Sequence, residues 1–104
     1  MVAAFDFDGV LSSERIQMLA KKMIRENNEV WVVTARGDNE FNRNIVREVL
    51  GKIKLSEFRV MFCGRKPKID YLKIINADIF IENNSDEFEN INNLTNTIPL
   101  IYAD

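Results

Sequence analysis

The chain has 104 residues, of which 46% are hydrophobic, and its 14 basic and 16 acidic side chains give a net charge of −2. This length predicts one domain with one core, covering residues 1–104. The balanced charge gives no general attraction for nucleic acid or for an anionic membrane, and no apolar run approaches the roughly 20 residues that span a bilayer. The chain contains no histidine, which excludes histidine-activated nucleophiles and leaves oxygen ligands that suit Mg²⁺.

Two features bear on the cellular compartment. Cys63 is the only cysteine, so it has no partner for an internal disulfide. The N-terminus enters strand-like sequence without a basic, apolar leader. We therefore expect a soluble protein of a reducing compartment, the cytoplasm.

The first predicted element is a strand over residues 2–7, and two acids lie at its end. Asp6 and Asp8 are one residue apart, with a glycine directly after them. Alternate side chains of a strand share a face, so both carboxylates should point the same way while Phe5 and Phe7 pack on the other side. Two like charges so close raise each other's pKa unless a cation lies between them, which favours a metal site or a carboxyl kept protonated as a general acid. The alternative is a strand end whose acids face solvent or cap the following helix.

Apolar periodicity predicts the other elements along the rest of the chain. In order they are helix 13–27, strand 30–34, helix 39–52, strand 58–63, a short helix opened by Lys68, strand 78–81, a helix through Phe88, Ile91 and Leu94, and strand 98–102. Gly51 is expected to mark the frayed end of the second helix. Pro99 predicts an edge position for the last strand, because proline cannot donate to a strand ladder.

This alternation predicts a three-layer α/β domain of the Rossmann-like type. Its sheet would be five-stranded and mostly parallel, with helices on both faces. Ligands of such sheets bind outside the carboxyl ends of the strands. Asp6, Asp8, Thr34 and the residues just after Ile81 all fall at such ends. The sequence therefore predicts one polar site at that edge.

The residues at this edge form a series of motifs. Asp6-Phe7-Asp8-Gly9-Val10 comes first, Thr34 ends the second strand, a lysine lies near the third helix, and Glu82-Asn83 follows the fourth strand. In kind and order they resemble the four motifs of the haloacid dehalogenase-like phosphohydrolase superfamily. The resemblance covers almost the whole chain and implies the same Rossmann-like fold.

The resemblance also implies a function, that of a Mg²⁺-dependent phosphatase acting through an aspartyl phosphate. Asp6 would be the nucleophile, and Asp8 would protonate the leaving oxygen and then activate the hydrolytic water. The Asp6 carboxylate, the Asp8 backbone carbonyl and the Glu82-Asn83 pair would hold the Mg²⁺ cofactor. Thr34 would hydrogen-bond a phosphoryl oxygen, and a lysine would offset negative charge in the transition state.

Two lysines compete for the third motif. Lys68 opens a helix and lies 14 residues before Glu82, a separation typical of compact members of the superfamily, so we favour it. Lys66 precedes Pro67 and fits a solvated loop charge.

The second motif continues as Thr34-Ala35-Arg36, a run that resembles nucleotidase-like and polynucleotide-phosphatase-like relatives. These three residues would bind substrate, with Arg36 gripping a phosphate bidentately. An exposed charge at the approach to the second helix is the alternative for Arg36.

The fourth motif departs from the superfamily pattern. Asn83 stands where a second acid is usual, so one negative charge is lost and metal binding should weaken. Glu82 or Asp86 could compensate, and a polar turn that caps the last helix is the alternative for residues 83–86. The competing function is therefore a phosphate-binding or regulatory domain with weak or no catalysis.

The short spacings between motifs leave no room for a cap domain. Only Val10-Leu11-Ser12 remains of the flap that commonly follows the first motif. An open site favours a large phosphorylated substrate that supplies its own lid, or closure by a neighbouring subunit in a homo-oligomer. The sequence leaves the substrate open among a nucleotide, a sugar phosphate, a nucleic-acid end and a phosphoprotein.

Two other α/β proteins fit the motifs less well. A receiver domain carries its phosphoacceptor aspartate after the third strand, where this chain has Cys63-Gly64. A dinucleotide-binding fold requires a glycine-rich fingerprint after the first strand, and this chain lacks it.

Overall fold

The computed structural model describes residues 1–103, which form one five-stranded sheet with four α-helices. The strands are β1 (Val2–Phe5), β2 (Glu29–Thr34), β3 (Val60–Phe62), β4 (Ile79–Glu82) and β5 (Ile98–Ile101), and the helices are α1 (Glu14–Arg25), α2 (Glu40–Ile53), α3 (Lys68–Ile75) and α4 (Phe88–Leu94). The strand order is β3-β2-β1-β4-β5, and every neighbouring pair is parallel. The predicted α/β architecture is confirmed, with a sheet that is parallel throughout.

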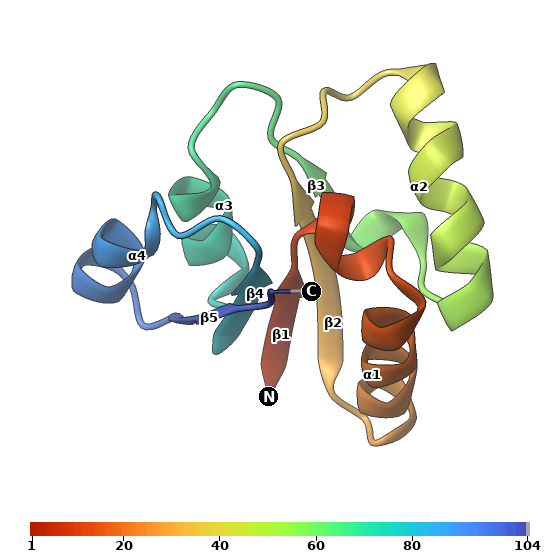
Figure 1. Cartoon of the computed structure of the whole chain (residues 1–104), viewed down its shortest axis with the longest axis horizontal. Helices are drawn as coiled ribbons and strands as arrows, with labels where there is room; N and C mark the ends of the chain where they lie inside the picture. The colour runs from red at the N-terminus through yellow and green to blue at the C-terminus, as the bar shows by residue number, and fades with distance from the viewer. Residues whose placement is uncertain (104) are drawn as a thin grey trace.

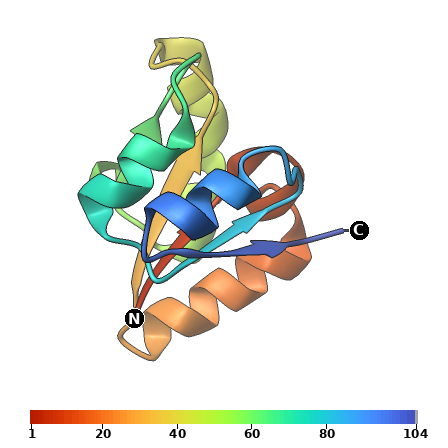
Figure 2. The same ribbon diagram turned by 90° about the vertical axis from the view of Figure 1, so that its left-hand side faces the viewer.

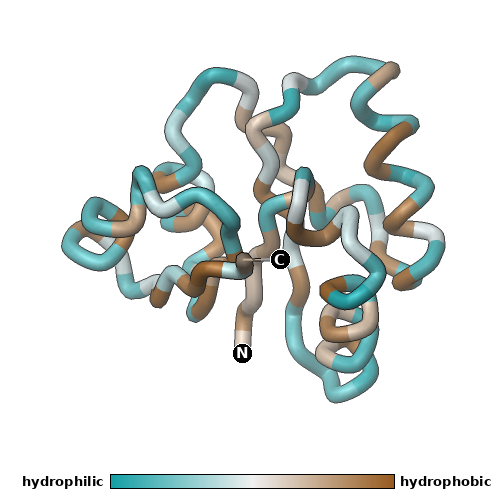
Figure 3. The backbone as a smooth tube through the Cα atoms, viewed as in Figure 1, coloured by the Kyte–Doolittle hydropathy of each residue, from teal (hydrophilic) through white to brown (hydrophobic). Residues whose placement is uncertain are grey.

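The helices form a layer on each face of the sheet (Figures 1 and 2). Helices α1 and α2 pack on one face with Phe5 and Val32, whereas α3 and α4 pack on the other with Ala4 and Phe80. Neighbouring residues of a strand thus pack into different cores, because successive side chains of a strand point to opposite faces of the sheet. Hydrophobic residues line the strands and the inner sides of the helices, while the loops beyond the carboxyl ends of β2 and β3 are largely hydrophilic (Figure 3).

Local capping and burial fix the ends of the first two helices. The Ser13 hydroxyl accepts the N–H of Ile16 at the start of α1, as expected of an N-cap. The expectation that Gly51 ends the second helix is wrong: α2 runs on to Ile53, and Lys54 after it adopts a left-handed conformation. Ile53 is 2% exposed, so its burial outweighs the roughly 1 kcal/mol that a helical glycine costs. Among the described helices, none is long and apolar enough to cross a membrane.

The first strand is shorter than predicted, which changes the setting of the acid pair. Strand β1 ends at Phe5, and Phe7–Leu11 form an irregular turn (η1) with non-helical backbone at Asp8 and Gly9, closed by a hydrogen bond from Ser12 N–H to the Phe7 carbonyl at 2.9 Å. Phe5 and Phe7 share one core as expected. Asp6 and Asp8, however, do not project from one strand.

Of the two edge strands, β3 is shorter than predicted and β5 has the edge position that was predicted. Strand β3 is shorter than residues 58–63, because Glu57–Arg59 form a turn of 3₁₀ helix before it. Strand β5 lies at the sheet edge, as Pro99 predicted. Ile98 and Tyr102 donate their N–H groups to β4 and its approach, so Pro99, one residue out of phase with Ile98, faces away from the ladder and needs no donor there.

Candidate functional site

The strand order creates a crevice between the carboxyl ends of β1 and β4. The chain leaves β1 for one face of the sheet and leaves β4 for the other (Figure 1), which is where open parallel sheets bind ligands. A cleft of about 380 Å³ lies there, and Asp6, Asp8, Lys68 and Glu82 are among the residues that line it. The predicted edge of the sheet therefore carries a cleft lined by the predicted acids and Lys68.

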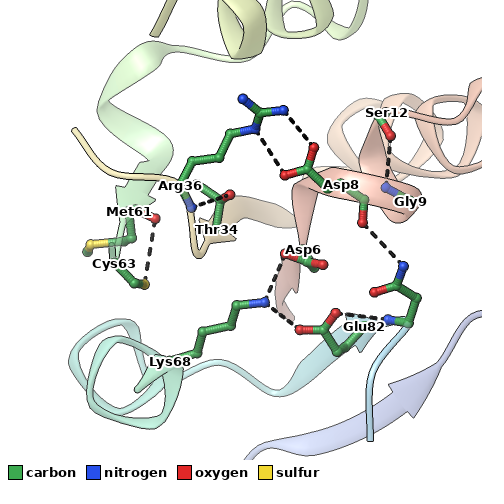
Figure 4. A network of polar contacts seen from close by, with 11 residues as sticks. Asp6, Asp8, Gly9, Ser12, Thr34, Arg36, Met61, Cys63, Lys68 and Glu82 are labelled. Atoms are coloured by element: carbon green, nitrogen blue, oxygen red, sulfur yellow. Dashed lines mark hydrogen bonds and ion pairs between the residues drawn. The ribbon is translucent and has the colours of Figure 1, made fainter. Parts of the chain in front are cut away.

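Asp6, Lys68 and Glu82 form a buried ionic cluster at the base of this cleft (Figure 4). Lys68 Nζ donates to Asp6 Oδ1 at 2.9 Å and to Glu82 Oε2 at 2.5 Å. The first turn of α3 supplies the lysine, and the ends of β1 and β4 supply the carboxylates. Three distant segments thus meet through one ammonium group. The favoured Lys68 reaches the acids, while Lys66 is exposed in the loop before α3.

Burial and proton sharing shift the ionisation of all three groups. Burial, together with the hydrogen bond that protonated Asp6 gives to Glu82, raises the pKa of Asp6 to about 7, although Lys68 opposes the shift. Burial acts against the charge of Lys68, but the hydrogen bonds to Glu82 and Asp6 outweigh it and raise the lysine pKa. Burial also acts against the charge of Glu82, whose hydrogen bonds with Asp6 and Lys68 hold its pKa below the usual value. As the pH falls through about 7, the pair therefore takes up its proton on Asp6, while Glu82 stays ionised.

Asp8 has a different environment from Asp6, which corrects the expectation of two carboxylates on one face. Arg36 donates Nε to Asp8 Oδ2 at 2.9 Å and Nη2 to Asp8 Oδ1 at 2.8 Å. The Asp8 side chain is 58% exposed. The strand ends before Asp6, and the turn that follows swings Asp8 toward the β2–α2 loop. The acid that shares a partner with Asp6 is therefore Glu82, since both bind Lys68 Nζ.

The second motif lies against this ion pair. Thr34 is fully buried at the end of β2, and its hydroxyl accepts the backbone N–H of Arg36 at 3.2 Å. A hydroxyl that accepts one hydrogen bond still carries a proton to donate. Ala35 lines the cleft beside Asp8. Thr34 thus fixes the start of the loop that carries Arg36.

Asn42 also holds the Arg36 side chain, a role that was not predicted from the sequence. Its Oδ1 accepts Arg36 Nη1 at 2.8 Å, and its Nδ2 donates to the carbonyl of Gly37 at 3.0 Å. Within the sequence it is one of 12 asparagines and falls in the first turn of a helix, where such residues are common for local reasons. No local signal separates it from the others.

Asn83 bridges the first and fourth motifs. Its backbone N–H donates to Glu82 Oε1 at 2.9 Å, and its side-chain Nδ2 approaches the Asp8 carbonyl at 3.4 Å. Gly9 has φ of 74°, and a Cβ there would collide with the Asn83 side chain. The glycine of the first motif therefore provides both the turn and the space for Asn83.

The available metal donors are oxygen atoms of mixed type. Within residues 1–103 no group of three or more Asp, Glu, Cys or His side chains is arranged to hold a metal ion. The Asp6 carboxylate, the Asp8 carbonyl and the Asn83 amide nevertheless converge on one cleft. Hard oxygen donors of this kind fit Mg²⁺, which retains several water ligands and needs few from the protein.

The loop after β4 was predicted either to contribute to the metal site or to form a polar turn, and it has features of both. Asn84 Oδ1 accepts the N–H of Asp86 at 2.9 Å, so the segment is a polar turn. Asp86 and Glu87 also line the cleft. In the described residues no side chain caps the first turn of α4, but the Ser85 carbonyl accepts the Phe88 N–H at 3.1 Å, so the turn contacts the start of the helix through its backbone.

Comparisons of the sequence with models of known protein families and with curated proteins found no match. The function of this site is therefore inferred from the chemistry of its residues.

Proposed function

We propose that this protein is a Mg²⁺-dependent phosphatase of the haloacid dehalogenase-like type, acting through an aspartyl phosphate on Asp6. The buried cluster carries the proposal, because a carboxylate at the end of a central strand faces a cleft and is held by one ammonium group. Burying two acids with one lysine costs stability, and strongly perturbed carboxyls in clefts are typical of catalytic sites.

The proposed reaction has two displacement steps. In the first, an Asp6 oxygen attacks phosphorus, the bond to the leaving oxygen breaks, and Asp8 donates a proton to that oxygen. In the second, Asp8 removes a proton from a water molecule, whose oxygen attacks phosphorus and releases Asp6 and inorganic phosphate. The Thr34 hydroxyl and the Lys68 ammonium would hydrogen-bond phosphoryl oxygens as their charge develops.

Asp6, the Asp8 backbone carbonyl and Asn83 would hold the Mg²⁺ ion, with Glu82 beside them. When bound, the ion supplies positive charge that offsets repulsion between the phosphate and the carboxylates and favours the ionised form of Asp6. Lys68 offsets only one of the two buried acids, so a second cation would favour the ionised Asp6 that attack on phosphorus requires.

A phosphate-binding or regulatory domain is the second candidate. Both oxygens of Glu82 have partners within the protein, Lys68 and the Asn83 N–H, and Asn83 offers an amide in place of a carboxylate. This arrangement favours weaker metal binding than a second acid would give. Turnover that depends on both Mg²⁺ and Asp6 would exclude this alternative.

The test is a phosphatase screen with and without Mg²⁺ on a nucleotide, a sugar phosphate, a nucleic-acid end and a phosphopeptide. We expect turnover of at least one class with Mg²⁺, loss of at least about 10³-fold in Asp6→Asn because an amide cannot attack phosphorus, and a phosphorylated Asp6 peptide after acid quenching. Turnover in Asp6→Asn close to the parent level would refute the assignment. No turnover of any class, combined with measurable phosphate binding, would favour the second candidate.

A further inference from the structure

Each nitrogen of the Arg36 guanidinium group donates a hydrogen bond to a protein atom. Nε and Nη2 donate to the two carboxylate oxygens of Asp8, and Nη1 donates to Oδ1 of Asn42. All three nitrogens of the fork therefore have acceptors. A phosphate could bind the Nε–Nη2 edge of this guanidinium bidentately only after Asp8 had left it.

Arg36 is also fixed along its length. Its backbone N–H is bound by the Thr34 hydroxyl at 3.2 Å, and its guanidinium lies 5.7 Å from the centre of the Phe7 ring. Phe7 belongs to the core, being 2% exposed, so it provides a rigid platform for the cation. The side chain thus has one well-supported position, which is the one that meets Asp8.

Asn42 secures this position from the second helix. The Asn39 side chain accepts the Asn42 backbone N–H at 2.8 Å, and Asn42 Nδ2 donates to the Gly37 carbonyl at 3.0 Å. The start of α2 and the β2–α2 loop are thereby joined around the acceptor of Arg36 Nη1. Asn42 therefore controls where the guanidinium lies.

Asp8 needs such support because no regular element fixes it. It follows the end of β1, on a turn, with ψ of 123° that interrupts the helical geometry, and its side chain is more than half exposed. An exposed carboxylate samples several rotamers, and small displacements of a proton donor lower its effectiveness steeply. A bidentate partner fixes both the position and the plane of the carboxylate. When Asp8 carries the proton that it donates, the protonated oxygen gives up its contact and the other oxygen keeps Arg36 as its partner.

We propose that Arg36, held by Asn42, is a positioning residue for Asp8, and that its main role is to orient this carboxyl for proton transfer to the leaving oxygen. This inference depends on the proposed phosphatase function. It gives Arg36 a role other than a grip on the phosphoryl group, and it assigns a role to Asn42.

The test compares two substrates that differ in their need for a proton donor. The p-nitrophenolate group leaves without protonation, whereas the alkoxide of glycerol 2-phosphate requires it. We expect Arg36→Ala to lower kcat/KM by roughly ten-fold or more for glycerol 2-phosphate and by less than about three-fold for p-nitrophenyl phosphate. Equal losses on both substrates would overturn the proposal and indicate a phosphate-binding role. The ratio is taken within one preparation, so a partly unfolded variant does not distort it.

Three further variants sharpen the comparison. Arg36→Lys keeps the charge but lacks the fork, so it should show the same selective loss; full recovery by lysine would contradict positioning. Asn42→Ala should give a smaller loss with the same selectivity. Arg43→Ala removes a nearby arginine that pairs with Asp38 at 2.6 Å, and it should change neither substrate.

A spectroscopic measurement separates this inference from the phosphatase proposal. In ¹⁵N NMR spectra of the parent protein, Arg36 Nε–H should give a sharp, exchange-protected signal that Asp8→Asn shifts and weakens. A signal unchanged by Asp8→Asn would refute the positioning role even if the protein hydrolysed neither substrate. Absence of turnover together with the expected shift would instead refute the phosphatase proposal and leave the contact established.

Discussion

Two ionic clusters lie at the same edge of the sheet and differ chiefly in exposure. The side chains of Asp6, Lys68 and Glu82 are 7 to 10% exposed, whereas those of Arg36 and Asp8 are 26% and 58% exposed. Water screens the second cluster and competes for its partners, but it has little access to the first. The buried cluster therefore sets the charge state of the proposed nucleophile, while the exposed pair mainly sets the position of the proposed acid.

Among the variants considered, removing Lys68 from the buried cluster should have the largest effect on stability and turnover. Lys68→Met leaves two buried acids without their cation, so we expect a loss of roughly 3 kcal/mol in the free energy of unfolding near neutral pH. Turnover should fall on the order of 10²-fold, as when one preorganised charge donor is lost. Chemical denaturation and steady-state kinetics measure the two effects.

Lys66→Met is the matched control, since it removes an exposed lysine two positions away. It should change stability and turnover little. Similar small losses from both variants would mean that the ammonium group does not hold the acids, and the buried cluster would lose its proposed role.

The pH dependence of stability should reveal the raised pKa of Asp6. An acid whose pKa rises from 3.8 to about 7 on folding stabilises the fold fully below pH 4 and loses this contribution as pH rises through about 7. In chelator-treated samples, Asp6→Asn should therefore gain stability relative to the parent between pH 5 and pH 8, on the order of 1–2 kcal/mol. Glu82 stays ionised in this window because its pKa is lowered. Parallel stability curves for parent and variant would show that Asp6 titrates as it does in the unfolded chain.

The mixed donor set can be tested by restoring the missing acid. Asn83→Asp places a carboxylate against the Asp8 carbonyl, where the amide now approaches it, so a cation becomes more favourable there. We expect Mg²⁺ affinity to rise several-fold, by about 1 kcal/mol or less, in calorimetric titrations. Asn84→Asp adds the same charge one residue further along, in the turn that accepts the Asp86 N–H, and it should have the smaller effect. Equal gains would indicate general electrostatics in place of ligation.

The exposed pair should show the smallest energetic effect. A double-mutant cycle of Asp8→Asn and Arg36→Ala is expected to give a coupling of less than about 1 kcal/mol in unfolding experiments, because water screens both partners. A coupling as large as that of Lys68 with Asp6 would mean that the pair is structural, and the contrast between the clusters would disappear.

Much of this arrangement could be predicted from local sequence. The apolar runs indicated five strands and four helices, and the parallel crossover rule placed Asp6, Thr34 and Glu82 at one edge. Pro99 indicated an edge strand because proline has no backbone N–H to donate, which excludes it from the middle of any sheet. Lys68 was favoured because it opens a helix, and α3 begins there.

The ends of α2 and of β1 depend on burial, so they could not be predicted from the residues next to them. Gly51 carries a helix-ending signal in sequence, but the burial of Ile53 extends α2 past it. The first strand ends at Phe5 because the next residues fold into the turn that buries Phe7 and Val10. Val10 and Leu11, which resembled the remnant of a flap, are therefore part of the core, while Ser12 after them is exposed.

The sequence by itself determined which elements form and which carboxylates stand at strand ends, because periodicity and strand alternation act over a few residues. Only the tertiary structure decided the pairing of those groups. Asp6 meets Glu82 and Lys68, which lie 76 and 62 positions away, while Asp8, only two residues from Asp6, turns to Arg36. Such partners are chosen by strand order, by the point where β1 ends and by the burial of each side chain, which depend on contacts between segments far apart in the chain.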